Sequence, residues 1–234
     1  MKKILISILL GVPMLGFAQS EWELPNANKQ TAPDNTRKEN KADSQNGKEA
    51  APMAEAKDWK YVRPNAVPES DGKVVFTDDM VFQSAPAQKI YEAAYATLDS
   101  LAHSEQQIQS GIALVNRKEH IIAARYTEWL EFSRSFISLD RTKFNYTIIA
   151  TCSDNKLHLS LERISYSYEE TRETGFKTNA ENWIADKKAL NKKRTKLLNG
   201  PSKFRKKTID RKDEIFAYIK SHIEAFLNDN KNKE

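Results

Sequence analysis

Basic residues gathered in one stretch, residues 187–212, offer the clearest chemistry in this sequence. Twelve lysines and arginines stand there against a single acid, Asp210, which gives the stretch a formal charge of +11. The whole chain carries only +5, so the rest of the chain after residue 18 is acidic, at −8. Such polarity steers an anionic partner toward one surface. The predicted anion-binding residues are Lys192, Lys193, Arg194, Lys196, Lys203, Arg205, Lys206 and Lys207.

An envelope protein, an acidic glycan and an anionic lipid surface all fit this charge, and the sequence leaves the choice among them open. A solvated basic face that only balances the acidic remainder is an equally weighted alternative. Single-stranded nucleic acid is disfavoured, because stacking on bases needs aromatic residues among the basic ones and Phe204 is the main example here. We therefore expect no nucleic-acid partner.

Catalytic patterns are missing from the sequence. None of the four histidines has a metal-ligand spacing, and His158 with Glu162, which share a strand face, fit a solvent-facing pair better than a metal site. No Gly-x-Ser-x-Gly elbow or phosphate-cradling glycine loop is present. The acid pairs at residues 78–79 and 169–170 could cleave glycosides only across a cleft of suitable width. The sequence thus predicts no enzyme, metal or cofactor, with a small-ligand or hydrolase site in a sheet concavity as the alternative.

A β-hairpin is the best-defined element. Alternate residues are apolar from Phe144 to Cys152 and again from Leu157 to Leu161, which is the period of strands with one buried face. The two runs meet at residues 153–156, where Asp154 and Asn155 suit a tight two-residue turn. Cys152, the single cysteine, falls on the apolar face, so we expect a buried, unreactive thiol and no intramolecular disulfide.

Other strands and helices surround this hairpin in the sequence. Strand-like runs cover residues 74–82, 112–116 and 120–132, with Glu128 as an acid on the apolar face of the last run. An amphipathic helix is predicted from a Ser84 cap through residue 102. A second is predicted from an Asp210 cap to residue 227, after a helix stop at Gly200-Pro201. The expected class is α+β, with two layers: a curved antiparallel sheet and amphipathic helices on one face.

The N-terminal region predicts export and then a linker. Two lysines, an apolar run over residues 4–15 and small residues before Gln19 indicate a secretory signal peptide, residues 1–18, and the residue directly after the cleavage point is not a cysteine that could be acylated. We expect a periplasmic or secreted protein that is not a lipoprotein and has no transmembrane segment after cleavage. Residues 19–71 are predicted to be a disordered linker, in which Trp59 and Tyr61 dock on the domain. One domain is predicted over residues 72–229, with a tail at 230–234.

Three segments resemble a known family. Residues 67–76, 180–187 and 203–216 are similar to motifs of a secreted bacterial domain of unknown function, family 4468, with a TATA-binding-protein-like (TBP-like) fold. The resemblance covers residues 67–227 and implies the curved sheet with helices on one face. It supplies no catalytic residue, and a shared fold does not imply DNA binding.

The leading hypothesis from the sequence is therefore a non-enzymatic periplasmic or secreted module of the cell envelope. It would bind an anionic partner through the basic stretch or serve as a structural part of the envelope.

Overall fold

The computed structural model describes residues 58–231. The predicted signal peptide, most of the predicted linker and most of the predicted tail lie outside these residues. Within them no helix is both long and apolar enough to cross a membrane.

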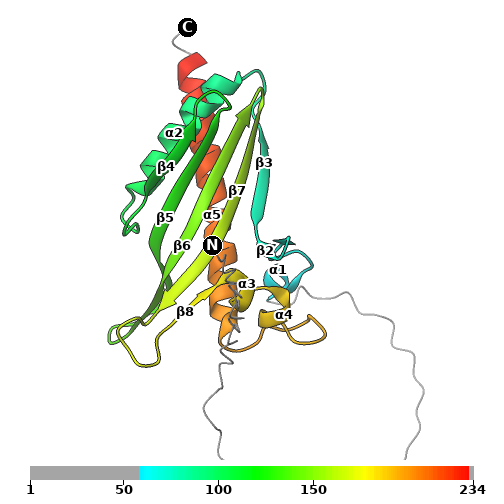
Figure 1. The fold of residues 1–234 in the computed structure, drawn as a ribbon, viewed down its shortest axis with the longest axis vertical. Coiled ribbons are helices and arrows are strands. Elements are labelled where there is room, and N and C mark those ends of the chain that lie inside the picture. The colour runs from blue at the N-terminus through cyan, green and yellow to red at the C-terminus, as the bar shows by residue number, and fades with distance from the viewer. Residues whose placement is uncertain (1–57, 232–234) are drawn as a thin grey trace, which may run out of the picture. The chain divides into compact units, whose positions relative to one another are not determined.

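A six-stranded antiparallel sheet forms one layer (Figure 1). Five strands follow the order β3-β7-β6-β5-β4, and β8 pairs with β7 beyond the segment of β7 that pairs with β3. These strands are β3 (Phe76–Val81), β4 (Gly111–Asn116), β5 (Ile121–Arg134), β6 (Leu139–Ser153), β7 (Lys156–Tyr168) and β8 (Phe176–Asn179). A separate two-stranded ladder consists of β1 (Glu69–Ser70) and β2 (Lys73–Val74).

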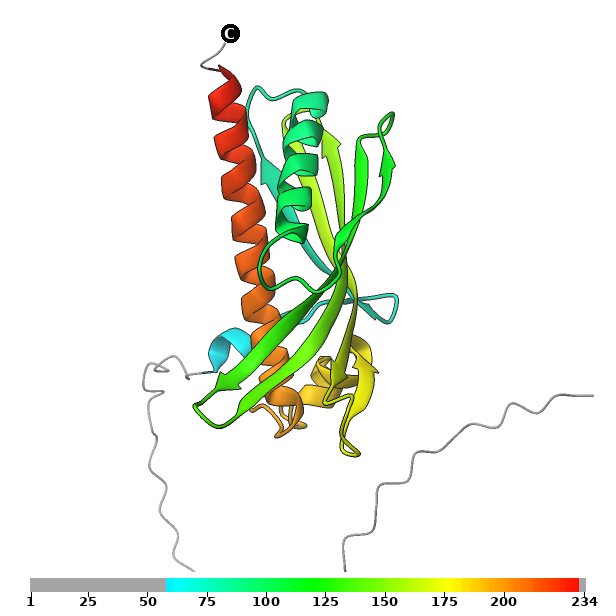
Figure 2. The same cartoon turned by 90° about the vertical axis from the view of Figure 1, so that its left-hand side faces the viewer.

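Two long helices, α2 (Ala87–Ala102) and α5 (Pro201–Lys231), form the second layer on one face of this sheet (Figure 2). Three short helices lie near the start of α5 in the fold: α1 (Trp59–Val62), α3 (Ala180–Trp183) and α4 (Asp186–Ala189). This arrangement confirms the predicted two-layer α+β class. At 1.5 Å per residue, the 31 residues of α5 span about 46 Å, so this helix covers the sheet from end to end.

The hairpin at the centre of the sheet follows its sequence pattern. β6 and β7 flank a two-residue turn in which Asn155 has a φ of +64°. Even-numbered residues from Phe144 to Cys152 are buried, as are Leu157, Leu159 and Leu161. Burial of Cys152 raises the pKa of its thiol to about 12, which fits the predicted unreactive cysteine. The core thus lies between the inner face of this sheet and the two long helices.

The start of α2 differs from the prediction. Ser84 is not its cap: the helix begins after Pro86, and Ser84 has a φ of +60°. Asp154, in the turn between β6 and β7, accepts a hydrogen bond from the Ala87 backbone N–H at 2.9 Å instead. A side chain from elsewhere in the chain therefore satisfies a donor in the first turn of the helix, where a local cap was expected.

The start of α5 is also corrected. Gly200-Pro201 is not a helix stop, because Pro201 is the first residue of α5 and Gly200 precedes it with a φ of +86°. Proline suits the first helical position, where its missing N–H would have had no partner in the helix. Asp210 consequently lies inside α5 and caps nothing. The nine helical residues before Asp210 include Phe204, Thr208 and Ile209, whose side chains are buried in the core.

Ordered structure begins earlier than the predicted boundary at residue 72. Val62, Ala66 and Val67 are buried against the domain. The Tyr61 hydroxyl donates to the Asp210 carboxylate at 3.0 Å, so this tyrosine docks on α5. The apolar residues of 62–67 are too few to appear as a hydrophobic run in the sequence, but they are enough to fold residues 58–71 onto a neighbouring helix.

Candidate functional site

The basic stretch at residues 187–212 is divided by the fold into a paired part on α5 and an exposed part on the loop that precedes it. Arg205 illustrates the first part, since none of its surface is exposed. Its guanidinium donates to the backbone carbonyls of Tyr61 (2.7 Å) and Ile184 (2.6 Å) and to the carboxylate of Asp186 (2.7 Å). Burial lowers the pKa of Arg205, while the Asp186 carboxylate acts in the opposite direction. Arg205 therefore joins α1, α3, α4 and α5, and its predicted role in binding an external anion is wrong because no face of it meets solvent.

Two more predicted residues are held by acids of this chain. The Lys203 ammonium lies 2.8 Å from the Asp140 carboxylate and 4.3 Å from the centre of the Tyr168 ring. Lys206 contacts the Asp58 carboxylate at 2.6 Å. These lysines are half-buried and already neutralised, so they offer less to an external anion than the sequence predicts.

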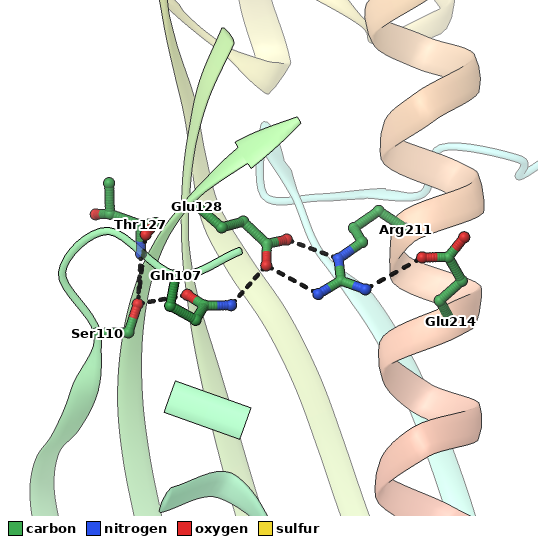
Figure 3. A network of polar contacts seen from close by, with 6 residues as sticks. All are labelled: Gln107, Ser110, Thr127, Glu128, Arg211 and Glu214. Atoms are coloured by element: carbon green, nitrogen blue, oxygen red, sulfur yellow. Dashed lines mark hydrogen bonds and ion pairs between the residues drawn. The ribbon is translucent and has the colours of Figure 1, made fainter. Parts of the chain in front are cut away.

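Arg211, also in the basic stretch, belongs to the network drawn in Figure 3. Its guanidinium makes two hydrogen bonds, at 2.8 and 2.9 Å, to the carboxylate of Glu128, which has no exposed surface. Gln107 donates to the same carboxylate at 2.6 Å, and Glu214 accepts from Arg211 at 3.1 Å. The Glu128 carboxylate raises the pKa of Arg211 despite the opposing effect of burial. This closed network holds α5 against β5. Its only sign in the sequence is an acid, Glu128, on the otherwise apolar face of its strand.

Residues 191–200, here called the cationic loop, form the exposed part. Asn191 fixes the loop: its side-chain oxygen accepts from the backbone N–H of Thr195 (2.8 Å) and Lys196 (3.2 Å). Leu190 and Leu197 form a β-bridge across its base. The loop is thus a closed turn of defined shape, built by local hydrogen bonds of the kind that asparagine side chains favour.

The cationic loop and its surroundings carry the basic side chains that face solvent. Lys192, Lys193, Lys196 and Lys207 are exposed, and within residues 58–231 none of them forms a salt bridge. Arg194 is exposed as well, but its guanidinium lies 3.9 Å from Asp186. Of the eight predicted anion-binding residues, the structure therefore places three unpaired lysines together on one short loop, and it leaves Lys207 on α5.

A cavity among the described residues bears on the alternative of a small-ligand site. One of about 790 Å³ lies beside α5 and β5, with Trp129, Arg141, Lys207 and Arg211 in its lining. Arg141 stacks on Trp129, with the guanidinium carbon 3.7 Å from the ring centre. Five basic and five acidic residues line this cavity. Most of them pair with one another or with neighbouring residues, which leaves Arg141 and Lys207, against Glu105, without a salt bridge among the described residues.

The remaining candidate residues do not assemble into a reactive centre. Nδ1 of His158 lies 2.7 Å from the Asp79 carboxylate on the neighbouring strand, and both side chains are about half exposed. This contact lowers the pKa of Asp79. Across the described part of the chain, no group of three or more His, Cys, Asp or Glu residues is placed to hold a metal ion.

Comparisons with known proteins agree with this fold. A family model described as "Domain of unknown function (DUF4468) with TBP-like fold" matches residues 76–167. A crystal structure of a DUF4468 family protein from Bacteroides ovatus is 38% identical, with a TM-score of 0.67, and the match covers 72% of this chain and 95% of that one. A TBP-like protein from Parabacteroides distasonis, 21% identical with a TM-score of 0.55 over 68% of this chain and 97% of that one, shares the fold. No curated protein matches the chain.

Proposed function

We propose that this chain, which belongs to the DUF4468 family of domains with a TBP-like fold, is a non-enzymatic binding module of the bacterial cell envelope. It acts in the periplasm or after secretion, in keeping with the export signal expected in residues 1–18. Its binding site for an anionic partner is the cationic loop.

One observation carries this proposal: Lys192, Lys193 and Lys196 face solvent without salt bridges to any described residue, on a loop whose backbone is fixed by Asn191. A preformed loop loses little freedom when a partner binds, so more of the Coulomb attraction appears as affinity. Because exposed charges are screened over about 8 Å at physiological salt, the binding should weaken as salt is added.

Retention on immobilised heparin, an anionic glycan, tests the site. The variant K192Q/K193Q/K196Q should elute at lower salt than the unmodified protein. The matched control is R117Q/K118Q/K220Q, which removes the same charge from exposed residues away from the cationic loop. If net charge alone governs retention, both variants will elute together, and the proposed site is then wrong.

The natural partner can be sought by crosslinking in intact cells, followed by purification and mass spectrometry. A defined partner should be recovered with the unmodified chain and the control variant, and lost with the loop variant. Equal recovery with all three proteins would reject the cationic loop as the recognition surface.

A second candidate is a small anionic ligand in the 790 Å³ cavity. Its volume is in the usual range for ligand sites, and Arg141 and Lys207 in its lining form no salt bridges among the described residues. Thermal melting in the presence of glucuronate tests this candidate. Glucuronate should stabilise the unmodified protein and leave R141Q/K207Q unchanged; an equal effect on both rejects it.

A further inference from the structure

The turn between β5 and β6 exposes two bulky apolar side chains. This hairpin tip, residues 135–138, has Phe136 at 105% and Ile137 at 90% relative exposure, and Leu139 next to it is 40% exposed. The turn is closed by Ser135, whose backbone N–H donates to the Ser138 carbonyl at 2.8 Å and whose hydroxyl oxygen accepts from the Ser138 N–H at 3.1 Å. The two apolar side chains are therefore presented outward by an ordered turn.

Nothing in the folding of the hairpin accounts for these side chains. Tight turns favour Gly, Asn, Asp, Ser and Pro, because those residues suit turn backbone angles or bond to the turn. Phe136 and Ile137 contribute neither property and bury almost no surface in the domain. Single exposed apolar residues are common, but two adjacent ones at a protruding tip indicate contact with an apolar environment.

The base of this hairpin is attached to the first turn of α5, directly after the cationic loop. The rings of Phe132 and Phe204 are 4.5 Å apart, and Lys203 pairs with Asp140 on the other strand of the hairpin. Figures 1 and 2 show the hairpin tip and the loop between α4 and α5 at the same end of the domain. An apolar tip and a set of free lysines thus occupy one end of one rigid structure.

Acids at this end are mostly neutralised inside the protein. Glu169 pairs with Arg172, and Glu170 pairs with Lys143 and Lys177. Three further acids form salt bridges: Glu131 with Arg134, Asp140 with Lys203, and Asp186 with Arg205. Among the acids of this end within residues 58–231, Glu173 and Glu181 form no salt bridge, and Glu181 accepts a hydrogen bond from the Val74 backbone N–H. The three lysines of the cationic loop form no salt bridge either. This end therefore carries both unpaired positive charge on the cationic loop and an apolar hairpin tip.

We infer that this end of the domain binds the surface of an anionic lipid bilayer. Phe136 and Ile137 insert at the boundary between headgroups and acyl chains, and the lysines of the cationic loop contact the anionic headgroups. An apolar insertion combined with electrostatic attraction is the usual basis of reversible binding at such interfaces. The inference rests on the proposed function and deepens it, because it names the anionic partner as lipid.

Vesicle flotation tests the inference on the chain from Gln19 onward, since the apolar run at residues 4–15 would bind lipid by itself. Vesicles contain phosphatidylcholine with or without phosphatidylglycerol. F136S/I137S should lower partitioning onto the anionic vesicles about tenfold or more, because two large apolar side chains no longer leave water. K192Q/K193Q/K196Q should lower it about a hundredfold, at roughly fivefold per lysine near an anionic surface.

Two controls separate the site from general effects. L114S removes another exposed apolar side chain, on β4 beside the start of β5, and should float like the unmodified protein. R117Q/K118Q/K220Q should float more strongly than the loop variant, although its charge is the same. Circular dichroism checks that each variant is folded.

Three results would overturn the inference: no flotation of the unmodified protein with anionic vesicles, equal flotation of F136S/I137S, or loss of flotation in L114S as well. A crosslinked protein partner that depends on Phe136 and Ile137, without flotation, would assign the tip to a protein instead. These failures differ from a failure of the proposed function, in which the loop variant and its charge-matched control elute together from heparin.

Discussion

Loss of either partner of the buried pair Glu128 and Arg211 should destabilise the domain strongly. Glu128 has no exposed side-chain surface and Arg211 has 16%, so neither charge is solvated as it would be in water. Removing one partner of such a pair costs about 3–5 kcal/mol, because the other charge stays buried without compensation. We therefore expect Glu128→Gln to destabilise the domain by about 4 kcal/mol, a large part of the roughly 5–15 kcal/mol typical of folded proteins.

Urea unfolding followed by circular dichroism measures this cost. With a slope of about 2 kcal/mol per molar urea, the midpoint of Glu128→Gln should fall by roughly 2 M. Arg211→Met should cost a similar amount, whereas the double variant E128L/R211M should lose far less than the sum of both, since apolar residues often replace a buried pair at little cost. Glu131→Gln is the control: it breaks an ion pair on the same strand that is exposed, and should cost less than about 1 kcal/mol.

Additive losses in E128L/R211M would refute this reasoning, as would a Glu128→Gln cost no larger than that of Glu131→Gln. Either result would mean that water reaches the pair in solution and screens it like a surface contact.

Further predictions concern two tyrosines, a surface carboxylate and the cysteine. The buried hydroxyl of Tyr146 has no hydrogen-bond partner among the described residues, so Tyr146→Phe should leave urea stability unchanged or raise it by about 1 kcal/mol. The hydroxyl of Tyr126, stacked against it, donates to a backbone carbonyl at 2.8 Å, so Tyr126→Phe should cost about 1–2 kcal/mol; the opposite order would contradict both assignments. The hydrogen bond with His158 lowers the pKa of Asp79, so its contribution to stability is present above the unfolded pKa of about 4 and is lost as pH falls through the folded value. Melting curves of Asp79→Asn should therefore lose less stability between neutral and acidic pH than those of the unmodified protein, and parallel curves would reject this. Cys152, with a thiol pKa of about 12, should react with a thiol reagent only after unfolding, and rapid reaction of the native protein would show that the thiol is accessible.

The sequence predicted correctly those elements whose formation depends on neighbouring residues alone. Alternation along β6 and β7 and the Asp154-Asn155 turn predicted the central hairpin, because strand period and turn chemistry are both short-range. The start of α5 was mispredicted because Gly200-Pro201 is compatible with two events, the end of one helix and the first turn of the next. Only the packing of Phe204 and Ile209 against the sheet decides between them.

The candidate site could be predicted only in part, because net charge along a sequence does not show which charges the fold neutralises. Four residues of the basic stretch pair with acids of other elements: Lys206 with Asp58, Arg211 with Glu128, Lys203 with Asp140 and Arg205 with Asp186. In the first three pairs the acid lies more than sixty residues away in the chain. Most basic residues in the first part of α5 are thus neutralised by acids of other elements of the domain. Lysines of the cationic loop escape this pairing because the loop turns away from the sheet and presents them to solvent. The part of the basic stretch that the fold leaves unneutralised is therefore the candidate for binding a partner, and it lies at the same end of the domain as the turn that exposes Phe136 and Ile137.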